Sequence, residues 1–282
     1  MTWRYALLAA LATSACTRGH ATQSTQARRV VSLGPATTEA LFAIGAGDRV
    51  VARSRYCDWP PEAARLPAVG GLEPDLEAIL QLSPDLVVGP SGQWSSRLAA
   101  TLQDHGIATW FPDEIRTLSG VDALLVGLGE RTDHAAQARA LGRELDAREQ
   151  AISRVLAGLP SERVLFVVGL TPVVVAGPES FADDLVRHAG DVNAVTAGGA
   201  WPTLGLERVV ELDPDVVVDA SVGESGGPTR ITPEAQGWSG VRAVRTGRVV
   251  ALADERVLRP GPRIADGLAV LARALHPGAS IP

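Results

Sequence analysis

The stretch that decides the fold is "LEAILQLSPDLVV" (Leu76–Val88), which returns further along the chain as "LERVVELDPDVVV" (Leu206–Val218). Leu, Glu, a second Leu, the Pro-Asp pair and two Val stand at the same offsets in both copies. In each copy the residues before the Pro have the pattern of a short helix, and those after it have the pattern of a buried strand. The repeat therefore predicts the same helix-turn-strand unit in each of two similar lobes.

The residues around each copy extend this pattern into two α/β lobes. Strands are predicted over 28–34, 48–54, 84–89 and 107–112, alternating with helices over 35–47, 76–82 and 97–106. The alternation restarts near Arg163, with strands over 163–170, 171–177, 214–220 and 247–254 and helices over 179–190, 206–212 and 263–276. Such alternation is typical of parallel βαβ units. We expect two Rossmann-like lobes with parallel sheets, an N-terminal one over 28–132 and a C-terminal one over 160–282.

One long helix is predicted between the lobes, over 133–159. Its apolar residues recur at helical spacing, and no Pro interrupts the segment; they are Ala138, Leu141, Leu145, Ile152 and Leu156. At a rise of 1.5 Å per residue, such a helix is about 37 Å long, enough to cross a domain. We expect a single packed helix to resist wide closure of the lobes.

The first 27 residues have the composition of a targeting segment and a tether. Residues 1–16 combine an early Arg, a short apolar run and small residues before Cys16, which is typical of a secretory signal peptide. The small residues before Cys16 resemble a lipobox, in which the Cys is lipidated; ordinary cleavage near Ala15 or Ala21 is the alternative. The polar residues 17–27 are predicted to be a flexible tether.

Composition excludes several classes of function. The net charge of −6 argues against a nucleic-acid partner, which favours a basic patch. Apart from Cys16 the chain holds only Cys57, with no base beside it, and none of the five His has ligand spacing to another. We therefore predict neither a metal site nor a cysteine nucleophile. "GESGG" (223–227) matches a nucleophile elbow around Ser225, but the helix-breaking "GGPTR" follows where a hydrolase needs a helix.

Four segments, taken in order with the internal repeat, resemble one family. They are "RRVVSLGPATTEALFAIG", "RYCDWPPEAARLPAVG", "GPESFADDLVRHAGDVNAV" and "RVVALADERVLRPGPRIADGLAVLARALHP". The chain resembles the periplasmic substrate-binding proteins of ABC importers with a helical backbone, and among them the cobalamin-, iron-siderophore- and haem-binding proteins. The resemblance implies a two-lobed binder of the periplasm or cell envelope that performs no chemistry. It also implies delivery of the ligand to a permease dimer in the inner membrane.

The candidate ligand-binding residues follow the ends of predicted strands, where α/β sheets bind ligands. They are Tyr56, Trp59, Trp94, Trp201, Asp254 and Arg259. Aromatic faces with a few polar anchors suit a broad, partly apolar ligand. Each residue also has a structural interpretation: the tryptophans could pack their loops, and Arg259 could pair with Asp254. Arg263, which follows Pro262 at a predicted helix start, is interpreted as structural.

The resemblance places cobalamin first among the ligands. Tyr56, Trp201, Arg259 and, with a one-residue insertion, Asp254 match ligand-loop residues of the cobalamin binders. Leu72 and Pro90 stand where those proteins carry Trp, and Trp94 is close enough in sequence to replace the second. An anionic ferric siderophore ranks second, with Arg53, Arg55 and Arg259 to receive it. Haem ranks third, with Tyr56 as its ligand.

The repeated Glu77 and Glu207 have two interpretations. A carboxylate in the first turn of a helix is favoured by about 0.3–1 kcal/mol through the helix dipole. The resemblance implies a second role, because cobalamin binders dock on their permease through one Glu on each lobe at matching positions. A twofold-symmetric permease offers the same basic pocket twice, so we favour docking over capping.

Overall fold

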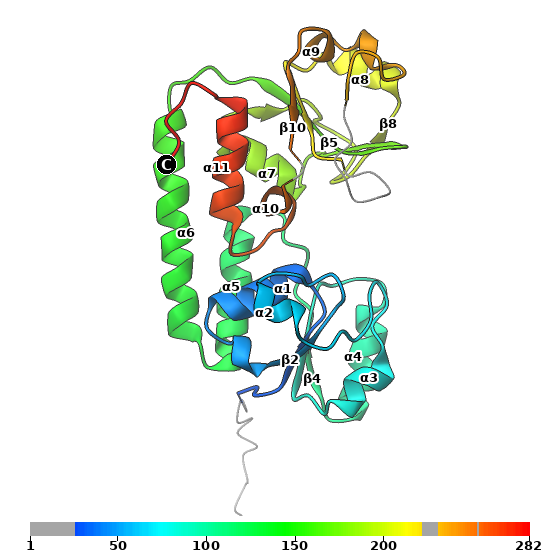
Figure 1. Cartoon of the computed structure of the whole chain (residues 1–282), viewed down its shortest axis with the longest axis vertical. Helices are drawn as coiled ribbons and strands as arrows, with labels where there is room; N and C mark the ends of the chain where they lie inside the picture. The colour runs from blue at the N-terminus through cyan, green and yellow to red at the C-terminus, as the bar shows by residue number, and fades with distance from the viewer. Residues whose placement is uncertain (1–25, 222–230, 253) are drawn as a thin grey trace, which may run out of the picture.

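A computed structural model describes residues 26–221, 231–252 and 254–282. Cys16 with the predicted signal segment, and Ser225 with the Gly-rich loop, lie outside the described residues. Within them the chain forms an α/β structure with two lobes, each built on its own sheet (Figure 1). The predicted fold class is confirmed.

The N-terminal lobe holds a parallel sheet of four strands in the order β2-β1-β3-β4. The strands are β1 (Val30–Ser32), β2 (Val50–Arg53), β3 (Leu86–Val88) and β4 (Ala108–Trp110). Its helical elements are α1 (Pro35–Ala43), η1 (Gly47–Arg49), α2 (Pro61–Ala64), α3 (Leu76–Gln81) and α4 (Ser95–Asp104). The central strands β1 and β3 are buried throughout, which explains why they have no polar alternation in the sequence.

The C-terminal lobe has a mixed sheet in the order β10-β9-β5-β6-β8, with β7 also paired to β5. The strands are β5 (Arg163–Leu170), β6 (Val173–Val175), β7 (Val192–Asn193), β8 (Thr203–Leu204), β9 (Val216–Asp219) and β10 (Val249–Ala251). Strands β6 and β8 run antiparallel to their neighbours, unlike the wholly parallel sheet we expected. Only Thr171 and Pro172 separate β5 from β6, which is too short for a parallel crossover and permits only a hairpin.

The helical elements of the C-terminal lobe lie between and after its strands along the chain. They are α7 (Phe181–His188), α8 (Leu206–Leu212), η2 (Trp238–Gly240), α9 (Arg242–Arg245), α10 (Glu255–Leu258) and α11 (Ile264–Leu275). Helix α11 packs against α10 and α7 and also against the long helix α6 (Ala135–Leu156). Helix α11 therefore connects the C-terminal lobe to α6.

The repeated phrase occupies the same place in both lobes. Helix α3 leads into β3 beside β1, and α8 leads into β9 beside β5. The repeated aspartates follow suit: Asp85 Oδ1 accepts a hydrogen bond from the Arg29 amide at 2.7 Å, and Asp215 Oδ2 accepts one from the Arg163 amide at 3.0 Å. Each carboxylate thus satisfies a backbone donor at the start of the first strand of its lobe. The repeat of Pro-Asp has a structural reason that is independent of any ligand.

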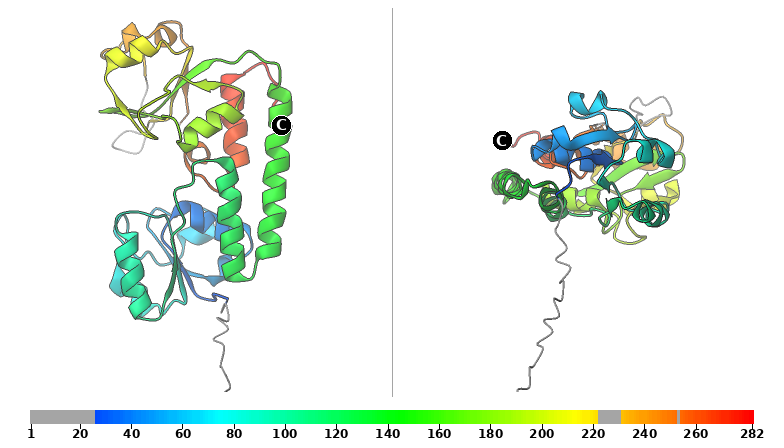
Figure 2. Two further views of the ribbon diagram at one scale, coloured as in Figure 1. Left: turned by 180° about the vertical axis from the view of Figure 1, so that it is seen from behind. Right: turned by 90° about the horizontal axis from the view of Figure 1, so that it is seen from below.

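Two antiparallel helices, rather than one, form the long side of the molecule. Helix α5 (Leu118–Thr132) packs along α6, and Asp133 turns the chain between them with a φ of 63°. Helix α6 begins and ends inside the predicted range 133–159 and runs beside both lobes (Figures 1 and 2). We missed α5 because glycines, which disfavour helices, interrupt its apolar pattern. One of them is required: a Cβ on Gly129 would lie 2.8 Å from the Cβ of Ala138 on α6.

The folded part of the chain begins earlier than the predicted tether suggested. Ala27 is buried, and its amide donates to the Arg131 carbonyl at 2.8 Å. The Arg49 guanidinium donates to the Ala27 carbonyl in turn. The last residues of the range 17–27 are therefore held against the end of α5.

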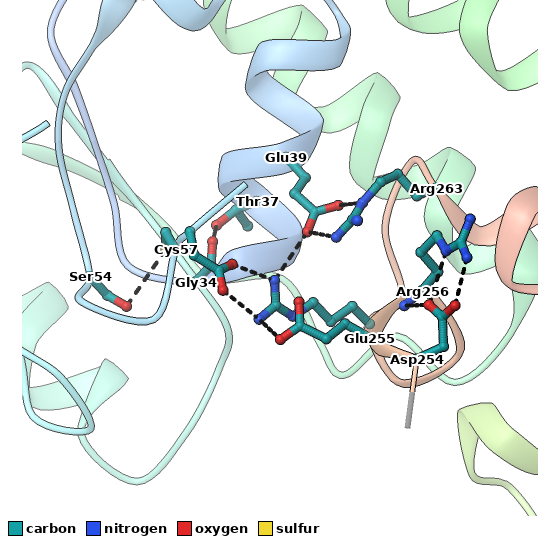
Figure 3. A network of polar contacts seen from close by, with 11 residues as sticks. Gly34, Thr37, Glu39, Ser54, Cys57, Asp254, Glu255, Arg256 and Arg263 are labelled. Carbon is teal, nitrogen blue, oxygen red and sulfur yellow. Dashed lines mark hydrogen bonds and ion pairs between the residues drawn. The ribbon is translucent and has the colours of Figure 1, made fainter. Parts of the chain in front are cut away.

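A buried ion pair joins the lobes on the cleft side. Glu39 on α1 has a side chain only 2% exposed, and both its oxygens accept hydrogen bonds of 2.7 Å from the guanidinium of Arg263, directly before α11 (Figure 3). The structural interpretation of Arg263 agrees with this contact. Glu39 lies beyond the first turn of α1. Its partner is therefore an arginine of the other lobe.

Replacing Glu39 by Gln should destabilise the fold by about 3–5 kcal/mol, because it leaves the facing guanidinium partly buried without its counter-ion. Urea unfolding followed by circular dichroism measures the change. Glu144→Gln on the exposed face of α6 is the matched control and should change the free energy of unfolding by less than about 0.5 kcal/mol. Equal stabilities of the two variants would show that the ion pair does not hold the lobes.

Candidate ligand-binding cleft

A cleft of about 330 Å³ lies where the two lobes face each other. The N-terminal lobe contributes the residues that follow β1, β3 and β4, namely Gly34–Thr37, Pro90, Ser91 and Pro112–Ile115, with Leu124 of α5. The C-terminal lobe contributes Phe181, Ala182, Trp201 and the segment Val257–Pro260. The carboxyl ends of the parallel strands thus form one wall, which is where open α/β sheets place their ligands.

The lining of the cleft is mostly apolar. Four prolines, Ile115, Phe181 and Val257 contribute to it, and among the described residues its charged members are Asp113, Glu114 and Arg259. Its volume falls within the range of small-molecule sites, which are lined by apolar side chains with a few polar groups. The cleft is therefore suited to a ligand that offers a broad apolar face.

Of the four predicted aromatic ligand residues, only Trp201 lines this cleft. Trp201 is 42% exposed, so its large ring is open to contact by a ligand. It lies directly before Pro202 and β8. An aromatic surface left open to water at the edge of an apolar cleft is a typical anchor for ligand binding.

Trp94 instead packs inside its own lobe. Its ring meets that of Phe111 edge-to-face, with the ring centroids 5.6 Å apart and the planes at 82°, and it packs against the buried core beneath α4. Pro90 lines the cleft in its place. Trp94 therefore does not take the place of the tryptophan missing at Pro90 in this lining, and its role in ligand binding stays a prediction.

Tyr56 and Trp59 lie on the loop after β2, outside the lining of the cleft. Each is 44% exposed, and each stacks on an arginine: Arg55 lies 5.3 Å from the Tyr56 ring centroid, and Arg263 lies 4.8 Å from that of Trp59. Trp59 thus packs against the same arginine that binds Glu39. These two aromatic side chains remain candidates for contact with a ligand larger than the cleft itself.

Arg259 lines the cleft but is already bound to carboxylates. Its guanidinium donates to Asp58 at 2.7 Å, lies 3.0 Å from Glu255 and reaches Glu39 at 3.4 Å. The hydrogen bond from Arg259 lowers the pKa of the Asp58 carboxyl below its usual value, so Asp58 is ionised at neutral pH. From the sequence we considered a pairing of Arg259 with Asp254. In the structure Arg259 pairs instead with Asp58, Glu255 and Glu39.

Asp254 does not line the cleft. Its carboxylate forms two hydrogen bonds with the guanidinium of Arg256, at 2.9 and 2.6 Å, and accepts the Arg256 amide as the N-cap of α10 (Figure 3). The pairing with Arg256 lowers the pKa of this carboxyl. Asp254 thus fixes the short helix that carries Val257 and Leu258 into the cleft, and it acts on the site only through that helix.

The two other arginines considered as anion receptors are engaged elsewhere. The Arg53 guanidinium donates to the backbone carbonyls of Ser54, Ala63 and Ala64. Arg55 stacks on Tyr56 and lies against Gly71. Neither lines the cleft.

Sequence reasoning missed part of the lining. The segment Asp113–Ile115 follows β4, and the rule that selected the loops after the other strands would have found it. Phe181 at the start of α7 was interpreted only as part of a helix. Glu39 and Asp58, which hold Arg259, carry no signal in the sequence, because their partner lies more than 200 positions away.

Glu77 and Glu207 are both exposed, in the first turns of α3 and α8. The two helices lie on the side of their lobes away from α6 (Figure 1). Asp75, not Glu77, caps α3, with its carboxylate accepting the Ala78 amide at 3.0 Å. Within the described residues neither glutamate forms an ion pair.

No helix in the described residues is both long and apolar enough to cross a membrane. No group of three or more His, Cys, Asp or Glu in the same ranges is placed to hold a metal ion.

Comparison with known proteins supplies the family. The family model described as periplasmic binding protein matches residues 30–255. This chain belongs to that family. The binding protein is 28% identical to the cobalamin-binding protein of Halobacterium salinarum over 269 residues, which cover 90% of this chain and 71% of that one. It is 26% identical to the ABC transporter substrate-binding lipoprotein YvrC of Bacillus subtilis, over 89% of this chain and 80% of that one.

Solved structures confirm the architecture of this binding protein. The haem-binding protein BhuT in complex with two haems superimposes with a TM-score of 0.76 at 29% identity, over 88% of this chain and 97% of that one. Relatives named for cobalamin and for haem are thus about equally similar to this chain. The side chains that line the cleft therefore decide whether cobalamin or haem suits this chain better.

The different packing of the two tryptophans predicts different effects of their removal on stability. Trp94→Ala should lower the free energy of unfolding by about 2–4 kcal/mol, because it leaves a cavity beside Phe111. Trp201→Ala should lower it by less than about 1 kcal/mol, since much of that side chain is already exposed. Urea denaturation of both variants measures the difference. A greater loss in Trp201→Ala would contradict the assignment of Trp201 to the cleft.

Proposed function

We propose that this chain is the substrate-binding component of an ABC importer and that it captures cobalamin or a related corrinoid between its lobes. The observation that carries the proposal is the apolar cleft between the lobes, with Trp201 exposed in it and its arginine already paired. Such a cleft recognises a broad ring by shape and burial. The proposed activity is binding and delivery, without a chemical step.

The lining favours a corrinoid over haem. Haem capture calls for a Tyr or His that reaches the iron, and among the described residues neither type lines the cleft. Tyr56, the candidate from the sequence, lies on the neighbouring loop and stacks against Arg55. Cobalamin carries both axial ligands of its cobalt, one of them the base of its own nucleotide, and needs no such residue from the protein.

The charges argue against a ferric siderophore. An anionic chelate needs free guanidinium groups. Of the three arginines considered for that role, Arg53 is bound to carbonyls, Arg55 stacks on Tyr56 and Arg259 is bound to three carboxylates. The name of the Halobacterium salinarum relative supports the same choice.

The location that we propose is the periplasm or the cell envelope, with a lipid on Cys16 as the anchor. The family and the lipoprotein relative in Bacillus subtilis support it. The partner that we propose is a permease dimer in the inner membrane. Docking through Glu77 and Glu207 is supported by their exposure on helices of different lobes and by Asp75, which already caps α3. A pair of carboxylates on similar lobes matches the repeated basic pockets of a symmetric permease.

Isothermal titration calorimetry with cyanocobalamin, an anionic ferric catecholate siderophore and haemin tests the ligand. We expect tight binding of cyanocobalamin and a loss of about 1–3 kcal/mol of binding free energy in Trp201→Ala, the scale of one buried aromatic contact. Val155→Ala, which removes an exposed apolar side chain from α6, outside the cleft, is the control and should bind as the unchanged protein does. Tight binding of haemin alone would overturn the proposal.

Uptake of cyanocobalamin into liposomes that contain the permease tests docking. The double variant Glu77→Ala, Glu207→Ala should lose transport while ligand affinity in solution is unchanged, since neither residue lines the cleft. Glu130→Ala with Glu144→Ala, which removes two exposed carboxylates from α5 and α6, should transport normally. Unchanged transport by the folded docking variant would leave only the helix-dipole role for this pair.

A further inference from the structure

The guanidinium of Arg259 lies in the cleft with its hydrogen-bonding groups already engaged. Nη1 is 2.7 Å from Asp58 Oδ1 and 3.4 Å from Glu39 Oε1, while Nη2 is 3.0 Å from Glu255 Oε1 and 3.5 Å from Asp58 Oδ2. The side chain is 19% exposed. Three carboxylates from α1, the loop after β2 and α10 therefore surround one cation of the cleft wall.

The charges around this arginine do not balance. Arg263 is the second cation of the group, bound to Glu39, so two guanidinium groups face three carboxylates. In the lining of the same cleft Glu114 pairs with Arg116, and within the described residues Asp113 has no ion-pair partner. The cleft that would receive a ligand thus carries an excess of negative charge, although an arginine lines it.

We infer that Asp58 determines specificity by occupying Arg259, so that the cleft accepts an uncharged or cationic ligand with a broad apolar face and excludes anionic ones. This inference rests on the proposed function, since it assumes that the ligand enters this cleft, and it adds the charge of the substrate class. An incoming carboxylate or phosphate would have to displace Asp58 from Arg259 and would also lie close to Asp113. Like charges so placed oppose binding and reject unwanted partners.

Asp58 is the partner of Arg259 that can be changed without loss of the fold. Its side chain is 57% exposed, whereas that of Glu39 is 2% exposed and also holds Arg263. Asp58 comes from a loop, and its hydrogen bond to Arg259 keeps its pKa low. Asp58→Asn removes the negative charge, preserves the size of the side chain and leaves Arg259 with two carboxylate partners in place of three.

The test compares two ligands that differ only in charge. Cyanocobalamin has no net charge, and its monocarboxylic acid, in which one propionamide is hydrolysed, carries one negative charge at neutral pH. We expect the protein to bind the uncharged corrinoid about tenfold more tightly than the acid. In Asp58→Asn the ratio should fall to about twofold, because Arg259 becomes available to the carboxylate.

Two further variants show which charge is responsible. Asp104→Asn makes the same chemical change at the exposed end of α4, outside the cleft, and should keep the tenfold ratio. Asp58→Asn combined with Arg259→Gln should lose the gain in affinity for the acid, since the freed cation is gone. The inference is overturned if the unchanged protein binds the two corrinoids equally, binds the acid more tightly, or has the same ratio in Asp58→Asn.

A second pair of probes separates this inference from the proposed ligand. N-phenyl-1-naphthylamine is uncharged, and 1-anilinonaphthalene-8-sulfonate is the same ring system with a sulfonate. If neither corrinoid binds, the proposed ligand is wrong, and fluorescence titration with these two dyes decides the charge preference alone. Tighter binding of the uncharged dye, with the preference reduced in Asp58→Asn, supports the inference. Equal binding, or tighter binding of the sulfonate, contradicts it.

Discussion

The placement of the two lobes relative to each other depends on the buried carboxylate of Glu39. It lies on α1 of the N-terminal lobe and binds Arg263 and, more distantly, Arg259 of the other lobe. A charge so deeply buried is tolerated only when its partners are fixed in place. Helix α5 packs on α1 of the N-terminal lobe and α6 packs on α11 of the C-terminal lobe, so the α5–α6 pair also connects the lobes. Together these contacts favour a cleft that exists before any ligand arrives, rather than one that forms by wide closure.

The same group of charges links stability to ligand choice. Arg263 is bound to Glu39 and stacks on Trp59, and Arg259 shares Glu39 while reaching into the cleft. An arginine in a binding site usually suggests an anionic ligand. Here its carboxylate partners use that capacity, and the remaining lining is mostly apolar, with Asp113 and Glu114 as further acids. The substrate class therefore follows from the partners of the arginine more than from the arginine itself.

Much of the fold could be predicted because it depends on local patterns in the sequence. The repeat around Leu76 and Leu206 predicted the two lobes, and the spacing from Ala138 to Leu156 predicted α6. The missed elements depend on tertiary contact: Gly129 of α5 permits the close approach to α6, and the turn at Thr171 reverses the strand direction. For the candidate site, the strand-end rule selected the loops of Trp201 and Arg259, both of which line the cleft. It could not show that Trp94 packs on Phe111 or that Asp254 binds Arg256, because both depend on how loops turn.

A crystal structure of the chain with cyanocobalamin tests the central claim most directly, that the lobes hold a preformed cleft for an uncharged, broad ligand. The account predicts the ring against Trp201 between the lobes, Arg263 still bound to Glu39, and Arg259 still bound to Asp58. A rotated lobe with the Glu39 contact broken, or Arg259 moved onto the phosphate of the ligand, would contradict it.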